Sequence, residues 1–181
     1  MKTQSNKYYV VFVLIIMFAA PGLAAYVFYQ HPSWLGSTRV NKGVLLSPPV
    51  VLKALGGEKK WRIVFWAPNA CDSACKNQLE TLAKVRLALG RKLYQVDQVL
   101  VLGDKAASLS VKEQSALKEM QFQLVQLSAA EASAHEGLLA EPKIFLADPN
   151  NYLILSYAAL VKPDDVYKDL KLLLNTTEKN G

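Results

Sequence analysis

A run of uncharged residues close to the N-terminus constrains this chain more than any other feature of its sequence. The run extends from Tyr8 to Tyr29, YYVVFVLIIMFAAPGLAAYVFY, and contains no Asp, Glu, Lys or Arg. As an α-helix its 22 residues are about 33 Å long, enough to cross a hydrocarbon core of about 30 Å. We therefore predict one transmembrane helix that anchors the chain in membrane lipid.

The charges that flank this run predict its orientation. Lys2 and Lys7 precede the run and no acidic residue does, which favours a cytoplasmic N-terminus. We expect residues 1–30 to form a cytoplasmic tip and a single-pass anchor in the cell inner membrane, with the remaining chain in the periplasm. The alternative is a signal peptide cleaved at Leu23-Ala24-Ala25, although the apolar run continues beyond that point.

The rest of the chain has room for one domain. A chain of 181 residues is long enough to bury a hydrophobic core that is stable without disulfide bonds. Pro and Gly residues interrupt any regular pattern in residues 31–58, which we interpret as a linker. Within it, residues 44–46 and 50–52 could form short strands laid against the domain, which we predict at residues 59–176. The formal net charge is +6, but its basic residues are scattered, which argues against nucleic-acid binding.

Residues from about 60 onward alternate between strand and helix patterns. Runs of β-branched and aromatic residues predict strands at 61–66, 96–102, 122–127, 143–147 and 152–157. Helical spacing and capping residues predict helices at 73–90, 111–120, 129–139 and 163–174. Parallel crossovers followed by an antiparallel hairpin predict an α/β fold, a three-layer sandwich.

The two cysteines, Cys71 and Cys75, fall where the first predicted strand passes into the first predicted helix. Positions i and i+4 share one helix face about 6 Å apart, which suits a disulfide or two thiolates on one soft metal. A helix N-terminus also favours the thiolate form. We interpret the pair as functional, with a structural disulfide or inert core thiols as the alternative.

These residues resemble known families. Residues 66–75, WAPNACDSAC, resemble the active-site turn of thioredoxin-like proteins, which implies a thioredoxin-like fold. The C-x3-C spacing behind an N-terminal anchor resembles the Sco/SenC copper chaperones of cytochrome c oxidase assembly. Residues 145–149, FLADP, are similar to a segment near the end of Sco domains, and the whole resemblance spans about residues 42–174.

The resemblance also implies site residues. In Sco proteins both cysteines and a distal histidine bind copper, which implies Cu(I) on Cys71 and Cys75 with His135 as a weaker third ligand. Ala140, rather than His135, aligns near the Sco histidine, and Asp72 stands where Sco proteins usually have proline. Pro142 resembles the cis-proline that faces the cysteines in thioredoxins.

The sequence leaves three functions open. The first is a Sco-like factor that handles copper or thiol redox state during assembly of a respiratory oxidase, whose subunits are then its partners. The second is a membrane-anchored thiol–disulfide oxidoreductase acting on other client thiols, with Cys71 attacking and Cys75 resolving. The third is a degenerate thioredoxin-like module that only scaffolds a membrane complex.

Overall fold

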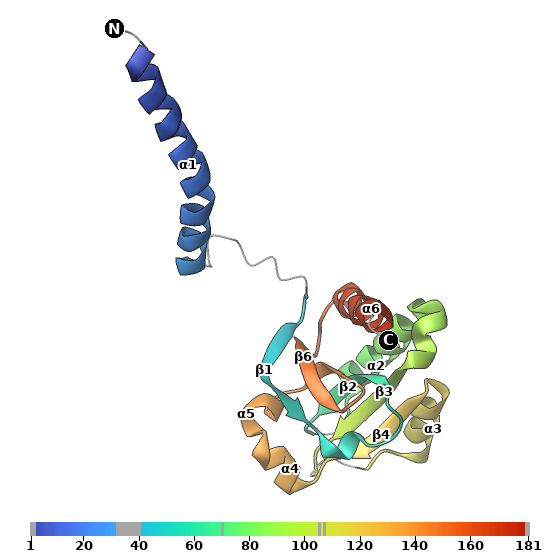
Figure 1. The fold of residues 1–181 in the computed structure, drawn as a ribbon. Coiled ribbons are helices and arrows are strands. Elements are labelled where there is room, and N and C mark those ends of the chain that lie inside the picture. The colour runs from blue at the N-terminus through green and yellow to red at the C-terminus, as the bar shows by residue number, and fades with distance from the viewer. Residues whose placement is uncertain (1–2, 32–40, 70, 105, 107, 180–181) are drawn as a thin grey trace. The chain divides into compact units, whose positions relative to one another are not determined.

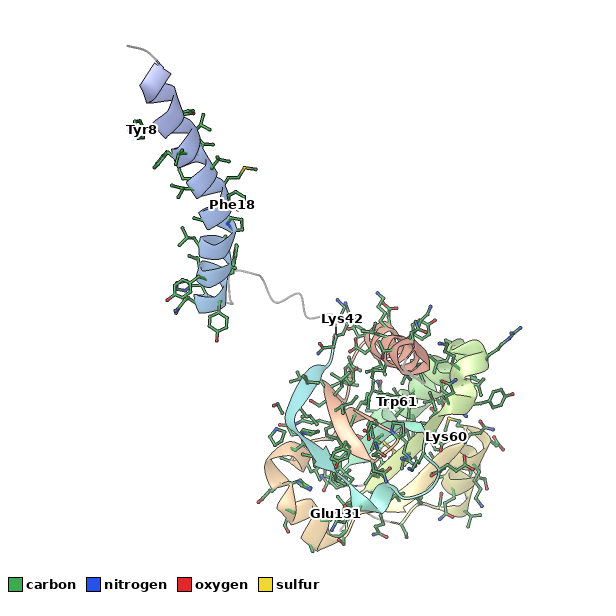
Figure 2. All side chains as sticks on the ribbon, in the orientation of Figure 1. Tyr8, Phe18, Lys42, Lys60, Trp61 and Glu131 are labelled. Carbon is green, nitrogen blue, oxygen red and sulfur yellow. A yellow bond between two sulfur atoms is a disulfide. The ribbon has the colours of Figure 1, made fainter. Side chains whose placement is uncertain are left out.

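The computed structural model describes residues 3–31, 41–69, 71–104, 106 and 108–179 (Figure 1). They belong to two compact units, Met1–Val40 and Asn41–Gly181. The first unit contains helix α1, Thr3–Gln30, whose segment Tyr8–Gln30 is long and apolar enough to cross a membrane. Its apolar side chains, Tyr8 and Phe18 among them, project outward along the helix (Figure 2). The predicted N-terminal apolar helix is confirmed as a candidate membrane span.

A six-stranded mixed sheet forms the centre of the second unit. The strands are β1 Val44–Val51, β2 Trp61–Ala67, β3 Val96–Leu102, β4 Phe122–Gln126, β5 Lys143–Ala147 and β6 Tyr152–Ala158. Their order across the sheet is β1-β6-β5-β2-β3-β4. Strands β2, β3 and β4 are parallel, whereas β5, β6 and β1 each pair antiparallel with their neighbour. This is the sheet of the predicted α/β fold.

Helices cover both faces of the sheet. They are η2 Lys53–Leu55, α2 Ser73–Ala88, η3 Gly90–Gln95, α3 Val111–Glu119, α4 Ala129–Ala134, α5 Glu136–Leu139 and α6 Pro163–Lys179. One core unites α2, α3 and α6 with Ile63 and Phe65 of β2. The other unites η2, α4 and α5 with Val64 and Trp66. Alternate residues of β2 thus face opposite cores, as the two-residue period of a strand requires.

Strand β1 lies within the segment that the sequence predicts as a linker. We expected residues 31–58 to connect the anchor to the domain, with 44–46 and 50–52 as short strands laid against it, and residues 44–51 form one strand that pairs with β6 at the edge of the sheet. The register shifts between Leu45 and Val50, around the cis Ser47–Pro48 bond. Proline has no N–H to donate, so an edge strand with an irregular register tolerates it. The compact unit begins at Asn41, and residues 32–40 lie outside the described part.

The segment before β5 also differs from its prediction. The sequence predicts one helix over residues 129–139, whereas the structure has two short helices, α4 and α5, separated at His135. The backbone of His135 has φ −127° and ψ 29°, outside the helical region. The chain therefore changes direction at this residue.

Candidate redox site

The turn between β2 and α2 holds the two cysteines at the carboxyl end of the parallel strands. Asp72 caps α2, and its Oδ1 accepts a hydrogen bond from the backbone N–H of Cys75 at 2.8 Å. The predicted helix cap is thereby confirmed. On the preceding side, the backbone N–H of Gly103 donates to Ala67 at 3.0 Å and holds the end of β2 against the end of β3. Both ends of the cysteine turn are therefore fixed.

Cys71 and Cys75 form a disulfide, with their Cα atoms 5.2 Å apart. The intramolecular disulfide that the spacing favours is therefore present. Both residues are buried, with exposed fractions of 7% and 8%, and both belong to the core beneath α2. The disulfide lies at the first turn of α2, where unpaired backbone N–H groups and the helix dipole stabilise a thiolate after reduction.

Two cavities border the disulfide, one at each cysteine. The larger, of about 340 Å³, borders Cys75, and its walls include Gln78, Pro142 and Leu160. The smaller, of about 120 Å³, borders Cys71 and lies between α2 and α3. Each sulfur-bearing residue therefore faces a different space.

An ion pair bridges α2 and α3 beside the smaller cavity. Lys76 Nζ lies 2.6 Å from Oε1 of Glu113, and Oε2 of the same carboxylate accepts hydrogen bonds from the backbone N–H and the hydroxyl of Ser110 at 2.8 Å. The hydrogen bond from Lys76, followed by those from Ser110, lowers the pKa of Glu113 from 4.5 to about 2. Ser110 and Glu113 also form the capping box that the sequence predicts for α3.

The structure does not bring His135 to the cysteines. His135 lies between α4 and α5, whose residues Ala132, Leu138 and Leu139 pack on the core opposite to that of Cys71 and Cys75. Within the described residues, no three His, Cys, Asp or Glu side chains gather closely enough to hold a metal ion. The prediction of His135 as a third copper ligand is therefore not supported, because the sheet separates the two segments.

Pro142 lies where the sequence places it, but with the other peptide isomer. It borders the larger cavity together with Cys75, so it faces the redox pair. Among the described residues the one cis bond is Ser47–Pro48, so the Glu141–Pro142 bond is trans and the cis-proline prediction is wrong. Trans is the lower-energy form of an X–Pro bond by about 0.5–1 kcal/mol, and the turn from α5 into β5 accommodates it.

Two residues near the site were not predicted from the sequence. Gln78 is 8% exposed, and its side-chain Nε2 has no hydrogen-bond partner in the described structure. Leu160, between β6 and α6, is 79% exposed although it is apolar. Gln78 leaves one signal in the sequence, since it is a polar residue at a helical position among the apolar residues Cys75, Leu79 and Leu82.

Solved structures share this fold at low sequence identity. ScoI of Arabidopsis thaliana with copper bound is 14% identical, with a TM-score of 0.51, over 66% of this chain and 86% of that one. A thiol:disulfide interchange protein from Bacteroides sp. is 19% identical, with a TM-score of 0.46, over 74% of this chain and 90% of that one. ScoI of Bradyrhizobium japonicum with copper bound is 15% identical, with a TM-score of 0.47, over 63% of this chain and 85% of that one.

The likeness to ScoI of Arabidopsis thaliana, at 14% identity, shows the fold alone. No curated protein sequence is significantly similar to the chain. Residues 61–177, which run from β2 into the last turns of α6, match the family model described as "Transmembrane-like, thioredoxin-like, C-terminal domain". With its apolar N-terminal helix and its thioredoxin-like sheet, the chain belongs to the transmembrane-like, thioredoxin-like C-terminal domain family.

Proposed function

We propose that the chain is a membrane-tethered thiol–disulfide redox protein whose active pair is Cys71 and Cys75. The observation that carries this proposal is the disulfide at the first turn of α2, bordered by a cavity of about 340 Å³. Reduction converts the disulfide into two thiols with the uptake of two electrons and two protons, and a client disulfide or dithiol is the exchange partner.

A purely structural role explains this disulfide poorly. It closes a loop of only five residues, which stabilises a fold by about 2 kcal/mol on the chain-entropy argument, against about 4.7 kcal/mol for a 100-residue loop. The domain already has a buried core on each face of its sheet. A short disulfide at a helix N-terminus beside an open cavity serves exchange chemistry better than it serves stability.

Tethering defines where this chemistry would take place. The helix α1 carries the apolar segment, and the preceding Lys2 and Lys7 favour a cytoplasmic N-terminus. The redox domain then lies in the periplasm, where cytosolic reductants do not reach. The Sco-like C-x3-C spacing and the fold shared with ScoI support a cysteine-bearing subunit of a respiratory oxidase as the client.

A second candidate function is the delivery of Cu(I) as cargo during oxidase assembly. The reduced sulfurs of Cys71 and Cys75 would be its soft ligands, and oxidation to the disulfide would release the ion. The two sulfurs lie close enough together to form a disulfide, so after reduction both can reach one ion, which favours this candidate. The position of His135 on the opposite core weighs against it, because the described residues then offer two sulfurs without the Sco-type third ligand.

One experiment separates the two candidates from the scaffold alternative. The full chain in detergent micelles is reduced under argon, and both its reduction of a model disulfide and its uptake of Cu(I) against a weak competing chelator are measured. We expect disulfide reduction that Cys71→Ser or Cys75→Ser abolishes. Uptake of one Cu(I) without disulfide reduction would favour the copper candidate, and neither activity would favour the scaffold.

A further inference from the structure

A buried amide on α2 has no acceptor in the disulfide form of the protein. The side chain of Gln78 is 8% exposed, and its Nε2 donates to no acceptor in the described residues. A buried donor without an acceptor costs free energy, and native proteins contain few such groups. Packing alone does not account for an amide here, because an apolar side chain would fill the same space at a lower cost.

Gln78 lies beside the redox pair. It borders the cavity of about 340 Å³ that Cys75 also borders. The two residues are three positions apart on α2, close to one helical turn, so they share one face of the helix. The unpaired amide of Gln78 is therefore a neighbour of the residue that carries one of the two reacting sulfurs.

The two other polar side chains that line this cavity differ from Gln78. Asn69 is exposed to solvent, and Asp72 accepts a hydrogen bond from the backbone N–H of Cys75 at 2.8 Å. The next N–H along α2, that of Lys76, donates to the carbonyl of Asp72 at 3.0 Å. These two backbone donors at the helix start are already used, whereas the buried side-chain donor of Gln78 is not.

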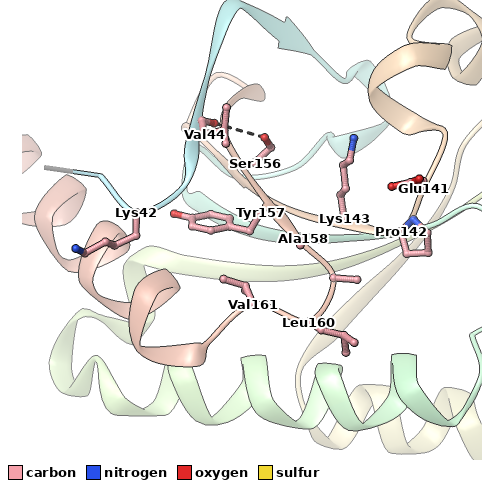
Figure 3. Close-up of a pocket in the computed structure, with 11 residues that line it drawn as sticks. Lys42, Val44, Glu141, Pro142, Lys143, Ser156, Tyr157, Ala158, Leu160 and Val161 are labelled. Atoms are coloured by element: carbon pink, nitrogen blue, oxygen red, sulfur yellow. Dashed lines mark hydrogen bonds between the residues drawn. The ribbon is translucent and has the colours of Figure 1, made fainter. Parts of the chain in front are cut away.

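No lysine, arginine or histidine lines the cavity beside Cys75 in the described part of the chain. Lys42 and Lys143 border a neighbouring cavity of about 750 Å³, between the start of β1 and the end of β6, and Pro142 borders both cavities (Figure 3). Figure 3 shows Lys42 at the end of the larger cavity away from Pro142, and Lys143 Nζ donates to a backbone carbonyl at 3.2 Å. Gln78 is thus the side chain that brings buried, partially positive hydrogens to the Cys75 side.

The strength of the Cys75 sulfur as an acceptor depends on the redox state of the pair. A disulfide sulfur is uncharged and accepts weakly, whereas the sulfur of a thiolate is an ionised acceptor and forms a stronger hydrogen bond. Most residues that line the cavity are apolar, and a low local dielectric constant strengthens such a bond. The amide of Gln78 has no good acceptor in the disulfide form and gains one when Cys75 is reduced.

From these observations we propose that Gln78 tunes the redox equilibrium: its side-chain amide donates a hydrogen bond to the Cys75 sulfur of the reduced protein and thereby makes the Cys71–Cys75 disulfide easier to reduce. The unpaired amide raises the free energy of the disulfide form, and the new hydrogen bond lowers the free energy of the reduced form. Both effects favour reduction. This inference rests on the proposed redox function.

Reduction by dithiothreitol is the balanced reaction on which Gln78 acts. The Cys71–Cys75 bond breaks, two electrons pass to the pair, and dithiothreitol is oxidised to its cyclic disulfide. The two protons lost by dithiothreitol pass to the new thiols, and where Cys75 remains a thiolate its proton goes to the buffer. The equilibrium constant of this exchange compares the two redox forms directly.

Gln78→Met tests this role, because methionine fills a similar volume and cannot donate a hydrogen bond. The full chain in detergent micelles is equilibrated at pH 7 with mixtures of reduced and oxidised dithiothreitol, and free thiols are counted by alkylation and mass spectrometry. We expect the equilibrium constant for reduction to fall about tenfold, which corresponds to a potential about 30 mV more negative. Gln78→Leu provides the same test with a second apolar side chain, should Gln78→Met fail to fold.

Gln98→Met is the matched control, since Gln98 is also a buried glutamine with an unpaired atom. It is 1% exposed on β3, its Oε1 has no partner in the described residues, and its Nε2 donates to the carbonyl of Met120 at 3.1 Å. It lines neither of the cavities that border Cys71 and Cys75. The same substitution should therefore lower the stability of both redox forms and leave the equilibrium constant unchanged.

Urea unfolding of the full chain in each redox state separates redox tuning from a structural role. In the disulfide form, Gln78→Met should not lower the free energy of unfolding, because it removes an unpaired donor. The loss in the reduced form should exceed that in the disulfide form by about 1.4 kcal/mol, the equivalent of the tenfold change. A residue with only a structural role would destabilise both forms alike.

The outcomes separate this inference from the proposed function. An equilibrium constant that Gln78→Met and Gln78→Leu leave unchanged would overturn the role of Gln78 and leave the redox function intact. An equal shift in Gln98→Met would also overturn it, since the effect would then follow from the loss of any buried glutamine in this core. If the unmodified chain shows no reversible transition at any ratio, the proposed redox function itself is wrong.

Discussion

Replacing Asp169 with asparagine tests how the first residues of the domain are held. Asp169 lies on α6 and is 2% exposed. Its carboxylate accepts hydrogen bonds from the backbone N–H groups of Lys42 and Gly43 at 2.7–2.9 Å and from the Tyr157 hydroxyl at 2.7 Å. These contacts connect the residues at the start of the compact unit to β6 and α6.

The loss of stability expected for Asp169→Asn follows from the hydrogen-bond donors that its carboxylate accepts from. A hydrogen bond to a charged group contributes about 1.5–3 kcal/mol, and Oδ2 alone accepts from Gly43 and Tyr157. Asparagine retains one acceptor oxygen but turns an NH2 group toward those donors. We therefore expect Asp169→Asn to lower the free energy of unfolding by about 3–5 kcal/mol and Tyr157→Phe by about 1.5–3 kcal/mol. The double variant should cost less than the sum, because both changes remove the same hydrogen bond.

Urea unfolding of the chain without residues 1–31, followed by tryptophan fluorescence at pH 7, measures these values. Asp164→Asn, at an exposed ion pair on the same helix, is the matched control and should cost less than about 1 kcal/mol. Burial, and then the hydrogen bond to Asp169, raise the pKa of Tyr157. The stabilisation by the protonated Tyr157 hydroxyl is therefore present below about pH 10 and is lost as the pH rises further. A loss below about 0.5 kcal/mol for Asp169→Asn would refute this reasoning.

Three further variants test individual features of the site. Gly103→Ala would place a Cβ 2.3 Å from the carbonyl oxygen of Pro68, so we expect lower stability and altered thiol reactivity, measured by urea unfolding and alkylation rates. Glu113→Gln should remove a part of the pH dependence of stability. Since the pKa of Glu113 is about 2 beside Lys76, the stabilisation by its carboxylate is present above about pH 4.5 and is lost as the pH falls toward 2. Unfolding measured across an acid titration would detect this loss. His135→Ala should leave the alkylation rates of both cysteines unchanged, because it lies with the opposite core; a change of more than about twofold would contradict that placement.

Local sequence patterns predict most of this fold. Strands β3 and β5 begin and end where their β-branched and aromatic runs do, and the caps of α2 and α3 are read from Asp72 and from the Ser110–Glu113 box. These features depend on neighbouring residues, so their signal is present in short windows.

The remaining features depend on contacts between distant segments. Strand β1 exists because residues 44–51 find β6, more than 100 residues away along the chain. The separation of His135 from the cysteines depends on which sheet face α4 and α5 cover, which no local pattern specifies. The cavity beside Cys75 likewise forms between α2 and the loop after β6. A sequence pattern therefore locates Cys75 but not the other residues that line the cavity.

A redox titration of the full chain tests most directly whether Cys71 and Cys75 are an exchanging pair. The chain in membranes is equilibrated with mixtures of reduced and oxidised dithiothreitol, quenched with acid, and alkylated with a mass-tagged maleimide. We predict one reversible two-electron transition in which both thiols appear together, and its absence in Cys71→Ser and Cys75→Ser. A pair that stays fully disulfide-bonded or fully reduced at every ratio would contradict the proposed function.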